Sequence, residues 1–139
     1  MIPDIRMNSK PRPPAGTRRK LKMLVVDDEP MVCDCIKGLL TYDGHEVHAV
    51  NSGRAALAAF EKDKFDLIFM DFAMPEMKGD ELAVAIKAIA PDQPIIMISG
   101  NVPVRGTLAG VDFIISKPVT LNDLREAIAR WSGEKIFAE

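Results

Sequence analysis

Short apolar runs recur along the chain, and stretches with apolar residues at helical spacing separate them. The runs are rich in β-branched residues and show little polar alternation, which is typical of parallel strands covered on both faces. They predict strands at residues 21–26, 46–50, 65–71, 94–99 and 112–116. The periodic stretches predict helices at residues 30–40, 53–62, 79–90 and 121–132.

The order of these elements predicts the fold class. Strand and helix alternate with short connections, which is the pattern of a parallel sheet with helices on both faces and right-handed crossovers. The segment at residues 101–110 is less regular, because Pro103 and Gly106 both oppose helix formation. We therefore predict a doubly wound α/β fold with five parallel strands, in which the fourth of five helices is shortened or irregular.

Polar residues that can cap helices support two of the predicted boundaries. Ser52 stands directly before the helix at residues 53–62, where its hydroxyl can accept a backbone N–H. Thr120 and Asp123, three residues apart at the start of the final helix, resemble a capping box. Both signals favour helix starts at these points.

Length and charge indicate one domain preceded by a basic arm. The 139 residues, 47% of them apolar, are enough for a single compact domain with its own core. The net charge is −2, yet residues 1–22 carry +6 and the remainder carries −8. We expect residues 1–20 to be a disordered Pro-rich arm, 21–133 the domain and 134–139 a tail. The arm is either a solvated linker or a contact for nucleic acid or an acidic partner.

Apolar run lengths and cysteine spacing indicate a cytoplasmic protein. No run approaches the roughly 20 residues that a membrane span needs, and the N-terminus has no hydrophobic segment of the signal-peptide type. We expect no membrane partner. Cys33 and Cys35 lie two residues apart in a predicted helix, hence on different faces, so a disulfide between them is not expected.

Ionisable residues stand at the ends of the predicted strands. Asp27 and Asp28 follow the first strand, Asp71 ends the third, and Lys117 follows the fifth. Because the carboxyl ends of parallel strands lie on one edge of the sheet, these residues should meet there. Three close carboxylates disfavour one another's ionisation, so the site needs the ammonium of Lys117 and a divalent cation. Mg²⁺ fits best, since it prefers a few carboxylates together with water and a phosphate.

Four motifs at these strand ends resemble the receiver domain of two-component response regulators, the CheY-like superfamily. They are VVDDEP, MDFAMPEMKG, ISG and SKP, in this order, within residues 22–133. Each motif alone is weak, whereas all four at the ends of strands one, three, four and five make a specific pattern. The resemblance implies a flavodoxin-like (βα)5 fold and a phosphoprotein that assists its own phosphorylation and dephosphorylation without being an enzyme.

The resemblance also implies a role for each acidic residue. Asp71 would accept a phosphoryl group from a sensor histidine kinase or a histidine phosphotransfer protein. Asp28 and Asp71 would ligate Mg²⁺ together with the backbone carbonyl of Ala73, and Asp27 would hold a metal-bound water. Taken alone, Asp71 could equally be a strand-ending residue that caps a loop, and Asp27 and Asp28 could be helix N-terminal acids.

The remaining implied roles concern the phosphoryl oxygens. Lys117 would pair with them, and its peptide bond to Pro118 is typically cis in the family. Ser99, at the end of the fourth strand, would move to hydrogen-bond one phosphoryl oxygen, although a serine before Gly100 also makes an ordinary turn. A lysine beside a turn proline could likewise be a surface residue.

The sequence departs from the family pattern in two places. Between Ser99 and Gly110 it is about four residues shorter, roughly one helical turn. The Phe or Tyr usual three residues before the lysine is replaced by Ile114, and Phe113 is displaced by one position. Adjacent strand residues face opposite sides, so Phe113 is not expected to replace that aromatic. These departures affect the surface expected to contact a downstream partner and leave the phosphorylation site intact.

Several functions and protein contexts are compatible with these residues. The leading hypothesis is a receiver in a two-component system or phosphorelay, without an attached effector or DNA-binding domain, that controls a protein partner as a monomer or weak dimer. A receiver segment of a hybrid histidine kinase is the alternative. A haloacid dehalogenase-like phosphatase usually has a second Asp where this chain has Ala73. A phosphorylation-independent interaction module would normally lack part of the acidic set, which is complete here.

Overall fold

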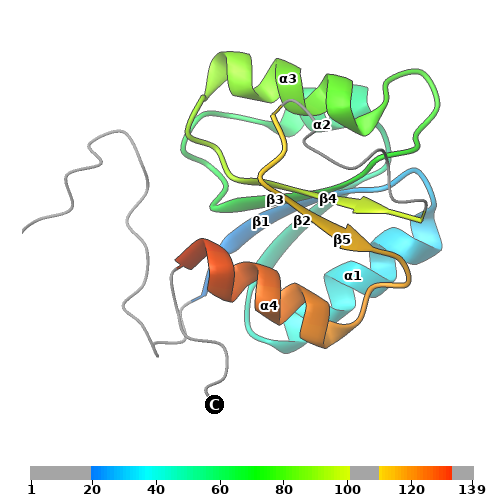
Figure 1. The fold of residues 1–139 in the computed structure, drawn as a ribbon, viewed down its shortest axis with the longest axis vertical. Helices are drawn as coiled ribbons and strands as arrows, with labels where there is room; N and C mark the ends of the chain where they lie inside the picture. The colour runs from blue at the N-terminus through cyan, green and yellow to red at the C-terminus, as the bar shows by residue number, and fades with distance from the viewer. Residues whose placement is uncertain (1–19, 101–109, 133–139) are drawn as a thin grey trace, which may run out of the picture.

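The protein folds as a parallel sheet between two layers of helices (Figure 1). The computed structural model describes residues 20–100 and 110–132. The strands are β1 (Lys22–Val26), β2 (Glu46–Val50), β3 (Leu67–Asp71), β4 (Ile95–Ser99) and β5 (Phe113–Ser116). The helices are α1 (Pro30–Tyr42), α2 (Gly53–Ala59), α3 (Gly79–Ile89) and α4 (Leu121–Ser132). The predicted irregular helix at residues 101–110 lies almost wholly outside the described residues and stays a prediction.

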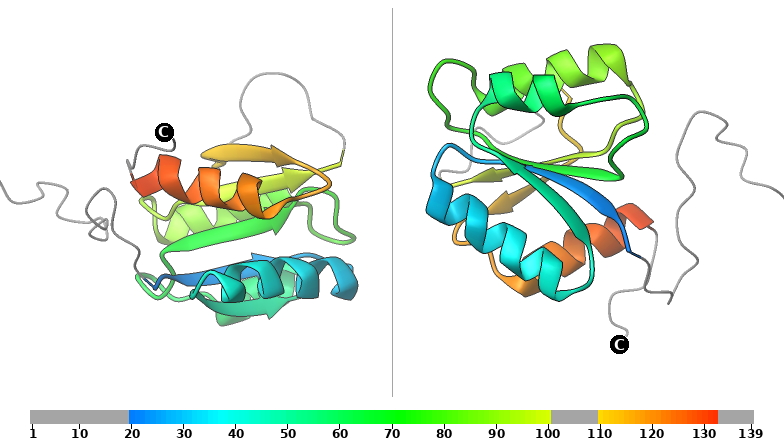
Figure 2. Two further views of the ribbon diagram at one scale, coloured as in Figure 1. Left: turned by 90° about the horizontal axis from the view of Figure 1, so that it is seen from below. Right: turned by 180° about the vertical axis from the view of Figure 1, so that it is seen from behind.

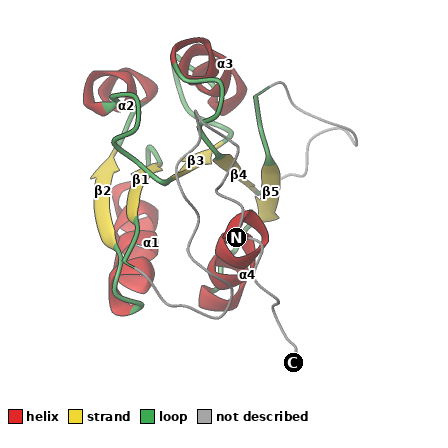
Figure 3. Ribbon diagram, turned by 90° about the vertical axis from the view of Figure 1, so that its left-hand side faces the viewer, coloured by secondary structure: helices red, strands yellow, loops and turns green. Residues whose placement is uncertain are grey.

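The strand order is β2-β1-β3-β4-β5, and all neighbouring pairs are parallel. Helices α2 and α3 cover one face of the sheet, and α1 and α4 cover the other (Figures 2 and 3). The chain moves outward from β1 to β2 and then returns past β1 to β3. Open α/β sheets bind their ligands outside the carboxyl ends of the strands at such a reversal. The predicted doubly wound, flavodoxin-like class is confirmed.

Two apolar clusters fill the spaces between the sheet and its helix layers. Successive residues of a strand alternate between them: Leu24 and Val26 belong to the cluster under α2 and α3, whereas Met23 and Val25 belong to the one under α1 and α4. Every residue of β3 and β4 is buried. This is why their sequences are continuous apolar runs rather than alternating ones.

The observed helix ends refine the sequence prediction. Both predicted caps are present: Ala55 N donates to Ser52 Oγ at 3.0 Å, and Thr120 and Asp123 exchange hydrogen bonds of 3.0 and 3.1 Å. Helix α2 ends at Ala59, three residues earlier than predicted, because Phe60 takes an extended backbone (φ −77°, ψ 135°). That conformation turns the Phe60 ring into the core, where the residue is 7% exposed.

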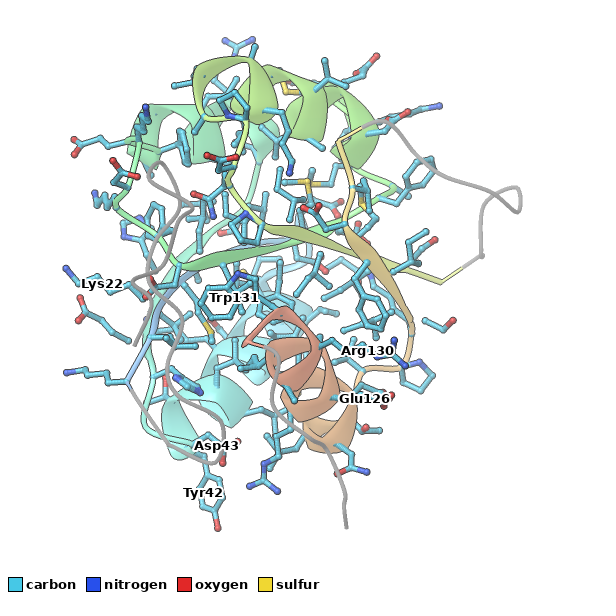
Figure 4. The ribbon with its side chains drawn as sticks, turned by 60° about the vertical axis from the view of Figure 1, so that its left-hand side comes forward. Lys22, Tyr42, Asp43, Glu126, Arg130 and Trp131 are labelled. Atoms are coloured by element: carbon cyan, nitrogen blue, oxygen red, sulfur yellow. The ribbon has the colours of Figure 1, made fainter. Side chains whose placement is uncertain are left out.

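Polar contacts of α4 fix it on its sheet face. Arg125 makes two hydrogen bonds of 2.7 Å with the carboxylate of Asp43, which lies directly after α1. Figure 4 shows Asp43 and the neighbouring Tyr42 at that end of α1. Near the other end of α4, the Arg130 guanidinium lies over the ring of Phe113, 5.1 Å from its centroid. Among the described residues, no helix has the length and apolar character needed to cross a bilayer.

Candidate functional site

Three carboxylates meet at the carboxyl edge of the sheet, as the sequence predicts. Asp27 and Asp28 follow β1, and Asp71 is the last residue of β3, the strand beside β1. One carboxylate oxygen from each of these residues lies within 4.8 Å of the others. Asp27 is 1% exposed and Asp71 4%, so little water reaches either carboxylate. The reversal in strand order thus concentrates negative charge in a mostly buried place.

Lys117 supplies a positive charge to this cluster from the end of β5. Its Nζ is 2.9 Å from Asp71 Oδ1 and 3.4 Å from Asp27 Oδ2. The backbone N–H of Lys117 donates to the carbonyl oxygen of Ser99 at 2.9 Å, which ties the ends of β4 and β5 together. The peptide bond between Lys117 and Pro118 is cis, as the family resemblance implied. The hydrogen bond to Ser99 and the two ion pairs hold Lys117 beside the acidic cluster.

Burial and neighbouring charges shift the pKa values of Asp71 and Lys117 in this cluster. Burial raises the pKa of Asp71 above its ordinary value, and the charge of Asp27 adds to that effect, although the hydrogen bond from Lys117 opposes it. Burial lowers the pKa of the Lys117 ammonium, but its hydrogen bond to Asp71 and the two negative charges outweigh that effect and raise the pKa overall. The raised pKa of Lys117 reflects the negative charges around it, whereas burial is the main cause of the raised pKa of Asp71.

Among the described residues, one oxygen of Asp27 has no hydrogen-bond partner. Its Oδ1 accepts from the backbone N–H of Glu29 at 2.9 Å. Its Oδ2 is buried and has no hydrogen-bond partner within the described part of the chain, although Lys117 Nζ is 3.4 Å away. A buried carboxylate oxygen of this kind, beside two further carboxylates, suits a hard divalent cation. The residues present therefore fit a Mg²⁺ site.

The structure places the other predicted residues on the same edge. Ser99 ends β4, beside β3, and is 3% exposed. Ala73 lies two residues beyond Asp71 and is exposed. Ser99 therefore ends its strand at the edge where the sequence predicts it.

Two contributions to the site were not anticipated from the sequence. A Cβ at Gly79 would lie 2.5 Å from the carbonyl oxygen of Asp71, so only glycine lets the start of α3 approach the end of β3 this closely. The side chain of Asn51 donates to the carbonyl oxygen of Asp27 at 2.9 Å. The glycine in MDFAMPEMKG was visible as part of a motif, but nothing in the residue type of Asn51 indicated its partner.

A doubly wound sheet in this order, with three carboxylates and a lysine at its carboxyl edge, defines the CheY-like class of α/β proteins. The match to a family model agrees: the response regulator receiver domain family matches residues 23–129. The chain belongs to this family. It is a receiver domain of two-component signalling, which is a phosphoacceptor rather than a classical enzyme.

Known proteins similar to the chain include both sequences and solved structures. Sensor protein GacS of Pseudomonas syringae pv. syringae is 32% identical over 130 residues, which are 87% of this chain and 14% of GacS. The chain spans a quarter or less of the first curated relatives that it matches. TrrA from Thermotoga maritima, solved in complex with Mg²⁺ and BeF, is 30% identical with a TM-score of 0.73, covering 81% of this chain and 98% of TrrA.

A second solved relative also holds magnesium. The receiver domain of sensor histidine kinase PA1611 from Pseudomonas aeruginosa PAO1 has a magnesium ion coordinated in its active site cleft. It is 27% identical to this chain, with a TM-score of 0.73, and the alignment covers 83% of this chain and 99% of that domain. Both structural relatives therefore share the fold over nearly their whole length.

Proposed function

We propose that Asp71 is the residue that accepts the phosphoryl group, and that the donor is a phosphohistidine of a sensor histidine kinase or a histidine phosphotransfer protein. The observation that carries this proposal is the 2.9 Å contact between Lys117 Nζ and Asp71 Oδ1 within a cluster of three carboxylates. Asp71 ends a central strand, whereas Asp27 and Asp28 follow β1. The sheet thus places the carboxylate of Asp71 next to the ammonium of Lys117.

The proposed reaction is a displacement at phosphorus. A carboxylate oxygen of Asp71 attacks the phosphorus of the phosphohistidine, and a P–O bond forms while the P–N bond breaks. The product is an aspartyl phosphate. The imidazole nitrogen leaves with the electron pair of the broken bond and takes up a proton. Negative charge on the transferring oxygens must be balanced, and the ammonium of Lys117 is in place to do so.

Mg²⁺ is the proposed cofactor. Asp28 and Asp71 would bind it directly together with the backbone carbonyl of Ala73, and Asp27 would hold one of its waters. The acidic cluster, the buried Oδ2 of Asp27 without a hydrogen bond among the described residues, and the magnesium in two solved relatives support this assignment. When bound, Mg²⁺ neutralises charge on the phosphoryl oxygens during transfer.

Ser99 and Lys117 would contact the phosphoryl group on Asp71. The Lys117 ammonium would pair with a phosphoryl oxygen, and the Ser99 hydroxyl would donate to another. The hydrogen bond from Lys117 N to Ser99 O joins the ends of β4 and β5. A movement of one strand end would therefore displace the other. A change of this kind would alter the surface that a protein partner contacts.

The proposed setting is a cytoplasmic receiver, formed by residues 21–133, that acts as a monomer or weak dimer. Its expected partners are the phosphodonor protein and one downstream protein. GacS, a longer sensor protein with a segment similar to this chain, illustrates the alternative in which the receiver serves within a hybrid kinase or a phosphorelay. Phosphotransfer from purified kinases of the same organism, scored by initial rate, would identify the donor.

Labelling with a small phosphodonor tests the proposed role of Asp71. Wild-type protein incubated with acetyl phosphate and MgCl₂ is expected to gain one base-labile phosphoryl group in intact mass spectra. Asp71→Asn should gain none, while Asp92→Asn, a matched change at an exposed aspartate, should label like wild type. Equal labelling of Asp71→Asn, or labelling that EDTA does not diminish, would overturn the proposal.

A further inference from the structure

The Asp27–Asp28 pair is held by a side chain from the neighbouring strand. Asn51 directly follows β2, and its Nδ2 donates to the backbone carbonyl oxygen of Asp27 at 2.9 Å. That carbonyl belongs to the peptide group that joins Asp27 to Asp28. Because a peptide group is planar, a hydrogen bond to its oxygen restrains the orientation of both residues that it links. Asn51 therefore acts on two of the three clustered carboxylates at once.

This hydrogen bond supplies a donor where the two strands separate. Val26 and Val50 are register partners, and Asp27 N donates to Val50 O at 3.2 Å. In a continuing parallel ladder, the carbonyl of Asp27 would next accept from the backbone N–H of Ser52. The chain turns at Ser52 to begin α2, where Ser52 Oγ accepts from Ala55 N. The amide of Asn51 takes the place of the next ladder donor.

The other polar atoms of Asp27 show what this arrangement achieves. Its backbone N–H is bound by Val50 and its Oδ1 by the backbone N–H of Glu29. With the carbonyl oxygen held by Asn51, only Oδ2 is left without a hydrogen bond in the described structure, 3.4 Å from Lys117 Nζ. The direction of that oxygen is thus set by β2 and by the start of α1.

We propose that Asn51 is a positioning residue for Mg²⁺ binding. It fixes the peptide group between Asp27 and Asp28, so that both carboxylates face the cation before it binds. The inference rests on the proposed function, because it assumes that the acidic cluster holds Mg²⁺. Removal of a partner that orients metal-binding groups weakens metal affinity, and for one exposed neutral donor we expect a loss of about three- to tenfold.

Asn51→Ala compared with Asn122→Ala tests this role. Both asparagines are exposed, but Asn122 lies in the first turn of α4. The apparent dissociation constant for MgCl₂ alone is measured from backbone amide NMR shifts, and acetyl phosphate labelling is measured at limiting and saturating MgCl₂. Asn51→Ala should bind Mg²⁺ about three- to tenfold more weakly and label slowly only at limiting MgCl₂. Asn122→Ala should match wild type in both measurements.

Thermal unfolding in EDTA separates positioning from a general structural role. Asn51 is exposed, so its truncation leaves no buried cavity, and the unfolding midpoint should fall only slightly, as the loss of one half-buried hydrogen bond predicts. Unchanged Mg²⁺ affinity in Asn51→Ala would overturn the inference, as would slow labelling at saturating MgCl₂ together with a strongly lowered midpoint. A wild-type protein that neither responds to MgCl₂ nor labels would instead overturn the proposed function itself.

Discussion

Asp71 is a buried carboxylate beside two others, and the ammonium of Lys117 is the one that contacts it among the described residues. The pKa of Asp71 is raised, first by burial and then by the charge of Asp27. The folded state therefore binds more protons than the unfolded state between the ordinary pKa of an aspartate and the raised one. The free energy of unfolding must fall as the pH rises through that window. Above that window the metal-free domain carries the full penalty.

Asp71→Asn is accordingly expected to stabilise the metal-free domain at pH 7, by on the order of 1 kcal/mol. The advantage over wild type should shrink as the pH falls, because protonation of Asp71 relieves the same penalty in wild type. Urea denaturation in EDTA at a series of pH values measures this directly. Asp92→Asn, at an exposed position, should show no such change. A destabilised Asp71→Asn would mean that the ion pair with Lys117 outweighs burial.

At the scale of elements, β5 presents consecutive residues to opposite helix layers. Phe113 packs against the apolar cluster under α1 and α4, whereas Ile114 packs against the cluster under α2 and α3. The expectation that these two residues face opposite sides is confirmed. Arg130 of α4, labelled in Figure 4, lies over the Phe113 ring, and this contact places the aromatic side chain on the α4 side.

Activation should therefore proceed without an aromatic ring moving on β5. Ile114 is branched at Cβ and restricted at χ1, and it has no ring to exchange between exposed and buried positions. With beryllofluoride and MgCl₂ as the phosphoryl mimic, we expect small NMR shift changes at the side chains of Phe113 and Ile114. The largest changes are expected at residues 100–110, most of which lie outside the described residues. An inward rotation of the Phe113 ring on activation would contradict this prediction.

The elements were predictable from sequence because their apolar patterns are strong. The apolar residues 67–70 form most of the central strand β3, where every position is buried, so burial imposes the same demand on each of them. The predicted end of α2 was wrong, because the helical spacing of apolar residues at 53–62 does not reveal that Phe60 leaves the helix to fill the core. Such local exchanges depend on tertiary packing rather than on the preferences of the segment.

The site was predictable to the extent that topology determines it. Parallel strands bring Asp27, Asp71 and Lys117 to one edge of the sheet independently of loop conformation. The sequence motifs identified these residues. Asn51 and Gly79 could not be found in the same way. Their contributions depend on a hydrogen bond across a separating strand pair and on the close approach of two backbones, neither of which residue type reveals.

At the scale of the whole molecule, charge divides the chain into a basic start and an acidic remainder. Residues 1–22 carry +6 and the rest carries −8. Residues 1–19, which make up nearly all of the predicted disordered arm, lie outside the described residues, and so does the predicted tail after residue 133. Among the described residues, the most N-terminal member of either apolar cluster is Leu21.

Deletion of residues 1–19 should therefore leave the domain intact. We expect the unfolding midpoint to change by less than about 2 °C and the rate of acetyl phosphate labelling to stay the same, because a Pro-rich basic segment buries too little apolar surface to offset its ordering entropy. Differential scanning calorimetry of both proteins measures the first quantity. A fall of several degrees would show that the arm docks on the domain.

Asp71 is proposed to carry the phosphoryl group in this receiver, and chemical trapping locates that group. Borohydride reduction converts an aspartyl phosphate to homoserine, so peptide mass spectrometry after phosphorylation and reduction locates the modified residue directly. We expect homoserine at position 71 only, dependent on MgCl₂, with Asp27 and Asp28 unmodified. Homoserine at position 27 or 28, or an unmodified position 71 in protein that has gained a phosphoryl group, would contradict the account.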